Sequence, residues 1–317
     1  MQPGLSTHIF FDQRLHQGHL DTLLSAGAKT IEVFAARHHF DYAATQPVRE
    51  LAAWFRSHDV RAVLHQPIYL AEGLREGGRA GRSGEAGQWS RHVAPSLDLI
   101  SRDKAHRIAA MDEVKRALES AEQIPFAAAV LHLGLKDSRW NEAAMEHSLT
   151  AIEHLKAFAG PLGLRLLLEN LVNEVATPVH LVEILHAGHF DRLGVCLDLG
   201  HLHLEQPLEP AADSGLAEAL SILGPRIGQL HIHDNRGAFA PSSALSEAAN
   251  IKDEHLWPGD GAMNWGAIGE ALESLPESTP AVLEIASGRA ADADIVVRKT
   301  QEFFSRQERV REQMQTR

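Results

Sequence analysis

In this chain of 317 residues, short apolar segments repeatedly end in a side chain that can bind a metal ion. The pattern occurs in Val63-Leu64-His65, Val130-Leu131-His132, Leu167-Leu168-Glu169, Cys196-Leu197-Asp198, Leu230-His231 and Val282-Leu283-Glu284. A lone imidazole or carboxylate buried at the end of such a segment is unfavourable unless it is paired or bound to a cation. The repetition therefore predicts that these side chains converge on one site for divalent metal.

Three further residues of metal-binding type, His201, Asp253 and His255, follow the later segments. Nitrogen and oxygen ligands without a thiolate suit manganese, zinc, cobalt or iron, and the histidines argue against a pure magnesium site. We expect one divalent ion per chain. The complete set, His65, His132, Glu169, Asp198, His201, His231, Asp253, His255 and Glu284, has enough ligands for as many as three.

Each of these residues also has an explanation without metal. A single histidine at a strand end is more often a hydrogen-bonded residue, and Glu169, Asp198 and Glu284 could each pair with an arginine. The metal hypothesis rests on the whole set, because a coincidence would have to repeat on six consecutive segments.

The chain has 20 histidines, and some have no such position. His233 shares a strand face with His231 and is expected to line the pocket without binding metal. His203 is expected to be structural. His38 and His39 do not end a predicted strand, and we place them on the surface or behind the site.

The elements that must position these residues alternate between short apolar runs and longer amphipathic segments. The runs predicted as strands are Thr7–Phe11, Thr30–Ala35, Ala62–His65, Ala127–His132, Leu164–Glu169, Leu193–Asp198, Ile227–His233 and Ala281–Ile285. Strands separated by helices indicate a parallel sheet covered on its faces, and eight of them close naturally into a (β/α)₈ barrel.

Helical spacing is clearest in three segments between these strands. The apolar stripes are Val48, Leu51, Ala52 and Phe55, then Ile108, Met111, Val114 and Leu118, then Met145, Leu149, Ile152 and Lys156. Their spacing is that of one helix face, and Gly160 is expected to end the third helix.

Two connections are extended: residues 71–101 after the third strand and residues 234–261 after the seventh. Both leave the strand ends where barrel enzymes build their substrate-covering loops, so residues 71–101 are a candidate lid. A disordered insert at residues 77–87 is the alternative. We expect residues 1–317 to form a single barrel domain, with a charged tail at residues 306–317.

The formal charge of −12 predicts neither a nucleic-acid nor an anionic-membrane partner. No stretch approaches the roughly 20 apolar residues of a membrane helix. The single cysteine, Cys196, excludes an internal disulfide, and the N-terminus lacks the pattern of a secretory signal. These features together predict a cytoplasmic protein.

With these motifs the sequence resembles the xylose-isomerase-like TIM-barrel superfamily, over almost all of residues 7–304. The motifs that carry the resemblance are Leu168-Glu169-Asn170, Cys196-Leu197-Asp198-Leu199-Gly200-His201, His231-Ile232-His233-Asp234-Asn235, His255-Leu256-Trp257-Pro258-Gly259-Asp260-Gly261 and Leu283-Glu284. The superfamily unites sugar isomerases and epimerases with apurinic-site endonucleases of the endonuclease IV type.

The epimerase branch implies roles for individual residues. It implies one metal ion held by Glu169, Asp198, His231 and Glu284. Glu169 and Glu284 would also transfer protons on opposite faces of the substrate. His201 would hydrogen-bond a substrate hydroxyl or carbonyl, and Arg236 would bind substrate beyond the strand-seven motif.

The remaining expectations concern loops around the pocket. His65 and Trp257 are expected to contact substrate, with Trp257 and the third-strand loop closing over it. Arg37 and Gln66 are further candidates for substrate specificity.

The endonuclease branch holds three zinc ions on residue types that are all present here, but its surrounding motifs differ. Those enzymes show Asp-Thr-Cys-His where this chain has Asp198-Leu199-Gly200-His201, and His-x-Asn-Asp where it has His231-Ile232-His233-Asp234. Their DNA-inserting segment is replaced by His65-Gln66-Pro67-Ile68-Tyr69. The forms present here are those of the isomerases.

We therefore expect an isomerase or epimerase of sugars, keto-sugars or polyols that acts through a metal-stabilised enediolate, with two glutamates as the acid–base pair. The alternatives are a keto-polyol dehydratase using the same enediolate, and a multinuclear zinc phosphodiesterase or apurinic-site endonuclease. A barrel that binds sugar without turnover fits the acid–base set poorly. The substrate would be a small molecule, and a homo-oligomer is compatible with such a barrel.

Overall fold

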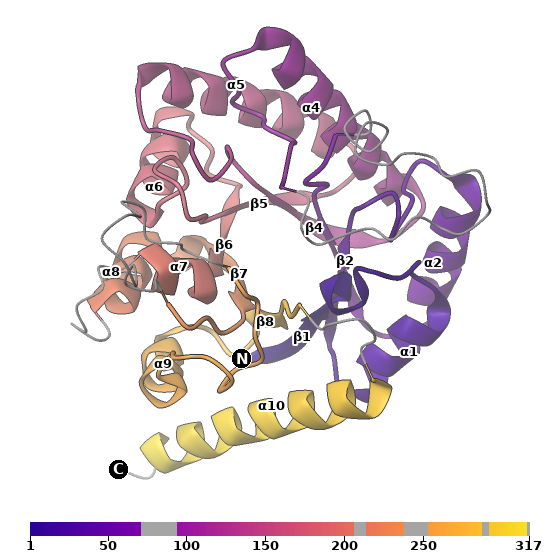
Figure 1. Ribbon diagram of the computed structural model, residues 1–317, viewed down its shortest axis with the longest axis vertical. Helices are drawn as coiled ribbons and strands as arrows, with labels where there is room; N and C mark the ends of the chain where they lie inside the picture. Colours follow the sequence, from indigo (N-terminus) through magenta and orange to yellow (C-terminus); the bar gives the residue numbers. More distant parts are fainter. Residues whose placement is uncertain (71–93, 206–213, 238–252, 287–291, 316–317) are drawn as a thin grey trace, which may run out of the picture.

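Eight parallel strands form a closed barrel in the order in which they occur along the chain (Figure 1). The computed structural model describes residues 1–70, 94–205, 214–237, 253–286 and 292–315. The strands are β1 (Gln2–Ser6), β2 (Thr30–Phe34), β3 (Arg61–His65), β4 (Phe126–Leu131), β5 (Arg165–Glu169), β6 (Gly194–Asp198), β7 (Ile227–Ile232) and β8 (Pro280–Leu283). The predicted (β/α)₈ fold is confirmed.

Helices surround the barrel as an outer ring (Figure 1). They are α1 (Gln17–Ser25), α2 (Thr45–Ser57), α4 (Lys104–Leu118), α5 (Glu142–Ala159), α6 (Pro178–Ala187), α7 (Leu199–Glu205), α8 (Ser214–Leu223), α9 (Trp265–Ala271) and α10 (Ala293–Gln315). Short 3₁₀ turns are η1 (Thr7–Phe10), η2 (Glu119–Glu122), η3 (Gly224–Arg226) and η4 (Leu272–Ser274). Within the described ranges, no helix has the length and apolar character needed to cross a membrane.

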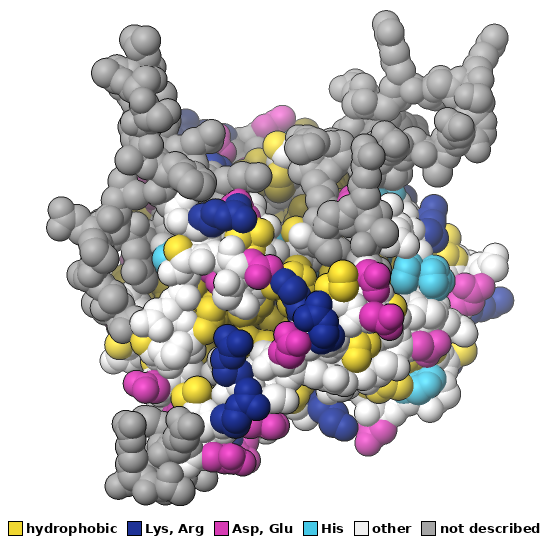
Figure 2. Space-filling model, turned by 60° about the horizontal axis from the view of Figure 1, so that its bottom comes forward, with side chains coloured by type: hydrophobic (Ala, Val, Ile, Leu, Met, Phe, Trp, Pro, Cys, Tyr) yellow, Lys and Arg dark blue, Asp and Glu magenta, His cyan; other side chains and the backbone are white. Residues whose placement is uncertain are grey.

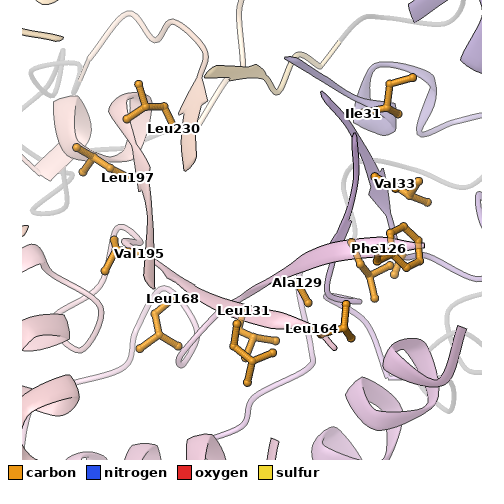
Figure 3. Close-up of a cluster of buried hydrophobic side chains, with 14 of the residues drawn as sticks. Ile31, Val33, Phe126, Ala129, Leu131, Leu164, Leu168, Val195, Leu197 and Leu230 are labelled. Carbon is orange, nitrogen blue, oxygen red and sulfur yellow. The ribbon is translucent and has the colours of Figure 1, made fainter. Parts of the chain in front are cut away.

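Side chains along each strand alternate between two apolar clusters, one under the helices and one inside the barrel. Leu131, Leu168 and Leu197 point away from the barrel axis and pack under the helices (Figure 3). Successive side chains of a strand face opposite sides. Their neighbours Val130, Leu167 and Cys196 therefore point into the barrel, where they form a separate buried cluster with Val63 and Ala128.

The same alternation aims the polar residues at the barrel mouth. His132, Glu169 and Asp198 each lie two positions beyond an inward-facing apolar residue, so they continue the inner face. Because all strands are parallel, their C-terminal ends meet at one face of the barrel. This geometry brings together residues that are distant in sequence.

The first predicted strand, Thr7–Phe11, is wrong. Residues Gln2–Ser6 form β1, and Thr7–Phe10 form a 3₁₀ turn in which the Ser6 hydroxyl caps the His8 amide. Gly4 makes the close strand pairing possible, because a Cβ there would lie 2.8 Å from Val282 Cγ2. The apolar spacing of the turn resembles a strand, whereas Pro3 and Gly4 obscure the real one.

The predicted helical segments form α2, α4 and α5. Val48, Leu51 and Phe55 are buried on α2, and Gly160 caps the end of α5. On α4 the prediction is wrong for Ile108, which is 52% exposed and lies off the buried stripe. The predicted tail from residue 306 continues α10 as far as Gln315.

The two extended connections are described only in part. Residues 71–93 and 238–252 lie outside the described residues, and with them most of the predicted lid and the alternative insert at residues 77–87. Residues 94–101 and 253–261 are described, and both segments contribute side chains to the barrel mouth.

We expect Gly188→Ala at the end of α6 to lower the free energy of unfolding by about 1–3 kcal/mol, the usual cost of overpacking. The new Cβ would lie 2.2 Å from the ring of buried Phe190. Gly160→Ala is the matched control, because it also ends a helix but its nearest neighbour is Lys156 O at 3.3 Å. Urea unfolding measures both variants, and equal stability losses would contradict the packing argument.

Candidate functional site

The first cluster consists of Glu169, Asp198, His231 and Glu284, from the ends of β5 to β8. One ligand atom from each residue lies within 4.8 Å of the others. His231 Nδ1 is 3.2 Å from Glu169 Oε1 and 3.2 Å from Glu284 Oε2. All four residues are buried. The arrangement concentrates three carboxylates and one imidazole in a volume that suits a single ion.

The donor atoms of the first cluster fit a divalent cation. Glu169 Oε1 and His231 Nδ1 are buried, and neither has a hydrogen-bond partner. Buried polar atoms are normally paired, so unpartnered acceptors that face one another indicate a missing positive charge. Three carboxylate groups and one imidazole nitrogen are ligands for zinc, manganese or cobalt.

Glu32 and Gln229 lie at the edge of the His231 ring that faces away from this cluster, and the sequence analysis missed both. The His231 Nε2 atom lies 2.9 Å from Glu32 Oε2, and Gln229 Nε2 donates to the same oxygen at 2.6 Å. An ionised carboxylate only accepts, so His231 Nε2 carries the hydrogen and Nδ1 presents its lone pair to the cluster. The available signal was Glu32 itself, a carboxylate in the middle of an apolar strand.

The second cluster consists of His201, His233, Asp253 and His255. His201 Nε2 and His255 Nε2 each lie 2.9 Å from Asp253 Oδ2. Their Nδ1 atoms donate to the backbone oxygens of Asn170 and Glu284, each at 2.9 Å. Because a carbonyl only accepts, these bonds orient both rings with Nε2 toward Asp253.

The third cluster consists of His65, His132 and Glu169. His132 Nε2 lies 2.9 Å from Glu169 Oε2, and His65 Nε2 lies 3.5 Å from the same oxygen. Glu169 therefore joins the third cluster to the first through its two oxygens. Asp198 joins the first to the second, because one of its oxygens lies 3.0 Å from His233 Nε2.

All nine candidate ligands fall in these clusters, and the structure adds two histidines. His233, predicted to line the pocket without binding metal, belongs to the second cluster and is not among the pocket-lining residues. His8 groups with His255 and Glu284, and its ring centroid is 5.1 Å from that of His255. The misplaced first strand hid His8, which the correct strand puts just beyond the end of β1.

His233 occupies space that only a glycine at position 200 leaves open. A Cβ on Gly200 would lie 2.1 Å from the His233 ring carbon Cε1. Gly200 and His233, two of the positions that differ from the endonuclease motifs, are therefore sterically coupled. A small residue at the start of α7 makes room for a large ring from the end of β7.

Asp234 holds the segment that carries Asp253 and His255. Its carboxylate accepts from the backbone amides of Gly259 and Met263 at 2.8 and 3.1 Å. It also accepts from Trp265 Nε1 at 2.8 Å. The backbone of Asp234 pairs with that of Leu256 in both directions at 2.8 Å. These bonds fold the described part of the β7–α9 connection back over the barrel mouth.

Several predicted substrate or surface residues lie elsewhere. Arg236 pairs with Glu254 at 2.6 Å, and Arg37 pairs with Glu113 at 2.7 Å. Trp257 is half-buried, with the Lys299 ammonium 5.6 Å from its ring. None of these, nor Gln66, lines the central pocket. His39 is buried and contacts Thr7 Oγ1 and Gln13 O. His38 is half-buried and contacts Phe11 O. His203 is also half-buried.

A surface position for His39 is therefore wrong.

Contacts within the clusters shift the pKa values of their side chains toward the charged forms, although burial shifts them the other way. Burial by itself raises the pKa of Glu169, but His231 and His132 lower it well below its usual range. Burial lowers the pKa of His255, but Asp253 and Glu284 raise it to about 9 overall. Asp253 and Glu284 likewise have pKa values well below the usual range, because their histidine neighbours outweigh burial. Glu169, Asp253 and Glu284 are therefore ionised at neutral pH and require a compensating positive charge.

A pocket of about 540 Å³ opens above the clusters. Its polar lining comes from His8, from Lys136, Asp137 and Asn173, and from the cluster residues His65, His132, Glu169, His201, Asp253, His255 and Glu284. The rest is mostly apolar and includes Phe34, Ile68, Leu97, Leu135, Leu171, Val172 and Leu204. This size suits a small molecule.

The family model that matches this chain describes a xylose isomerase-like TIM barrel, and the match spans residues 20–307. The chain belongs to this family. The xylose isomerase-like fold is shared with a D-tagatose 3-epimerase-like protein, at a TM-score of 0.68 and 19% identity, over 99% of this chain and 100% of that one. It is also shared with the IolI protein, whose crystal structure has a bound zinc atom, at a TM-score of 0.70 and 16% identity, over 97% and 98% of the chains.

A sequence relative of this xylose isomerase-like chain is the protein y4fM of Sinorhizobium fredii. The two are 26% identical over 193 residues, which cover 58% of this chain. The match spans 55% of the length of y4fM. At 19% and 16% identity, the two solved structures show only that the fold is shared.

We expect Gly200→Ala to destabilise the protein by about 1–3 kcal/mol in the wild-type background, because the new methyl group overlaps His233. In a His233→Ala background the same change should be neutral or stabilising, since alanine favours a helix over glycine. Urea unfolding of the four proteins in this double-mutant cycle measures the coupling. Gly266→Ala in α9 is the control, because its Cβ would meet only Asn264 Oδ1 at 3.4 Å. Equal losses in both backgrounds would show that His233 is not the obstacle.

Proposed function

We propose that this protein is a divalent-metal-dependent isomerase or epimerase of sugars, keto-sugars or related polyols. The observation that carries the proposal is the first cluster, in which Glu169 and Glu284 flank His231 at the base of a pocket of small-molecule size. The fold shared with a D-tagatose 3-epimerase-like protein supports the same class of reaction.

Glu169, Asp198, His231 and Glu284 would hold the metal ion. When bound, a divalent ion supplies Lewis acidity that polarises the substrate carbonyl and stabilises negative charge on the substrate oxygens. The mixed nitrogen and oxygen donors favour manganese, zinc or cobalt. Glu32 and Gln229 keep His231 in the orientation that this role requires.

The two glutamates would move the proton. One carboxylate, assigned here to Glu169, accepts the proton from the carbon beside the carbonyl, and the C–H electron pair passes into an enediolate. Glu284, which must first take up a proton, then donates it to the opposite face or to the neighbouring carbon, and the carbonyl forms again. Return to the opposite face inverts the centre, whereas return to the neighbouring carbon moves the carbonyl. General acid–base transfer of this kind contributes about 10²–10⁴-fold to the rate.

Two pocket histidines would orient the substrate. His201 Nε2 and His65 Nε2 lie among the carboxylates of the clusters and within the pocket lining. In both rings Nδ1 donates to a backbone carbonyl, so Nε2 of the neutral ring can accept a hydrogen bond from a substrate hydroxyl. Arg236 and Trp257 lie outside the described lining, so the proposal gives them no contact with substrate.

The charge of the chain and the one face shown in Figure 2 support a small-molecule substrate. On the face shown in Figure 2, Asp and Glu side chains lie among Lys and Arg side chains rather than apart from them. The whole chain carries a formal charge of −12. A nucleic-acid partner would be expected to meet a clustered basic surface.

We expect Glu169→Gln and Glu284→Gln each to lower deuterium exchange from solvent into a ketohexose by about 10²-fold or more. The amide cannot accept or deliver the proton. NMR of substrate and product in D₂O measures the exchange. Glu174→Gln is the control, because Glu174 lies nearby, pairs with Arg139 and is outside the pocket lining. Full exchange in both site variants would remove the two glutamates from the proton-transfer step.

A second candidate function is a multinuclear phosphodiesterase or apurinic-site endonuclease. It is favoured by one observation, the continuity of the three clusters through Glu169 and Asp198. Up to three ions held there would activate water and neutralise a leaving oxygen.

Metal stoichiometry separates the two candidates. For the isomerase we expect elemental analysis to find one tightly held ion per chain, lost in His231→Ala but kept in His255→Ala, and no nicking of abasic DNA. Three zinc ions per chain, with one lost in His255→Ala and one in His132→Ala, together with nicking, would establish the hydrolase instead.

A further inference from the structure

One sector of the pocket wall is mainly apolar. It consists of Ile68, Pro95 and Leu97 from the β3–α4 connection, Leu135 from the β4–α5 connection, Leu171 and Val172 from the β5–α6 connection, and Leu204 from α7. We call these residues the apolar wall. They come from consecutive connections around the barrel mouth, where Lys136, Asp137 and Asn173 also line the pocket.

Polar groups near the apolar wall are already used or lie in solvent. Asn173 donates through Nδ2 to Leu133 O at 3.1 Å, and its Oδ1 accepts from the amides of Val175 and Ala176, both at 2.8 Å. Lys136 and Asp137 are exposed. Among the described lining residues, none beyond the clusters and His8 presents a buried polar group to this part of the pocket.

This wall is a poor partner for a ligand that carries a hydroxyl on every carbon. Each hydroxyl seated against leucine or valine would lose its hydrogen bonds to water without replacement, at a penalty of roughly 1–3 kcal/mol. A methylene or aromatic group in the same place would instead gain by leaving water. The pocket is therefore polar where the clusters lie and apolar where the ligand extends away from them.

We propose that the physiological ligand is an amphiphilic α-hydroxy carbonyl compound or diol, with two adjacent oxygens at the clusters and an alkyl chain or ring against the apolar wall. This inference rests on the proposed function for its polar half, since the oxygens need the ion held by the first cluster. It narrows the substrate class from fully hydroxylated sugars to compounds with a deoxygenated or alkylated end.

Straight-chain hydroxamic acids, from acetohydroxamic to hexanohydroxamic acid, are probes that chelate metal with two adjacent oxygens and vary only in the apolar tail. We expect calorimetric titration of the zinc-loaded full chain to show an affinity gain of about three-fold for each added methylene that reaches the wall. The readout is binding, so it does not depend on knowing the reaction.

Two variants localise the effect. Val172→Thr replaces a methyl group by a hydroxyl of the same size, and Leu135→Asn places an amide in the wall. Both should reduce the gain per methylene to less than two-fold while leaving the affinity for acetohydroxamic acid within about two-fold of wild type. Val179→Thr and Ile108→Asn are matched controls, because both residues are 52% exposed and lie outside the pocket lining. Thermal unfolding checks that all four variants are folded.

The outcomes separate this inference from the proposed function. Equal affinity along the hydroxamate series, or an unchanged gain in both wall variants, would overturn the apolar wall and leave the isomerase proposal standing. A normal gain together with no proton exchange on any α-hydroxy ketone, deoxygenated and alkylated compounds included, would support the wall and overturn the reaction. No binding of any hydroxamate would overturn both, because the polar half of the ligand would have no ion to meet.

Discussion

Buried negative charge at the mouth of the barrel is the constraint on which the rest of the site depends. Glu169, Asp198 and Glu284 converge on His231, and Glu32 lies behind the same ring. In a low-dielectric interior such carboxylates repel one another strongly unless positive charge lies among them. The neighbouring histidines lower the pKa values of Glu169 and Glu284 despite burial, so both groups remain carboxylates. A divalent cation would meet the same requirement with fewer protons.

Around this centre, a second set of hydrogen bonds restricts the movement of the site residues. Asn170 joins β5 to β6, because its Nδ2 donates to Asp198 O at 3.0 Å and its Oδ1 accepts from the Asp198 amide at 2.7 Å. Asp234 ties the segment carrying Asp253 and His255 to the end of β7. Side chains held in this way are preorganised, so little ordering remains when an ion or a ligand arrives.

The site combines features that point in two chemical directions. The continuity of the clusters permits several ions, as a hydrolase would need, whereas the glutamate pair and the small pocket suit proton transfer on one small molecule. The contact between Gly200 and His233 affects the second cluster, which only the multinuclear hydrolase would need. It brings a third imidazole against Asp253 and Asp198, which changes the donors of the second cluster without altering those of the first.

The sequence alone was sufficient for the barrel and for the grouping of nine candidate side chains at its mouth, whereas their role as ligands stays a prediction. Parallel strands with a period of two send every second residue to one face, and their ends to one mouth, so His132, Glu169 and Asp198 could be placed together from local pattern. That reasoning failed at Thr7–Phe11, where a 3₁₀ turn imitates strand spacing, and it missed Glu32 and His8.

Tertiary structure decided everything that depends on which strands and loops meet. Arg236 and Trp257 follow a site motif in the sequence, yet Arg236 turns to Glu254, and neither residue lines the pocket. The room for His233 over Gly200 and the apolar wall from consecutive connections could not be read from any single segment. The reason is physical: local periodicity determines the direction of a side chain from its own strand, whereas its neighbours are set by strand register and loop docking, which involve distant residues.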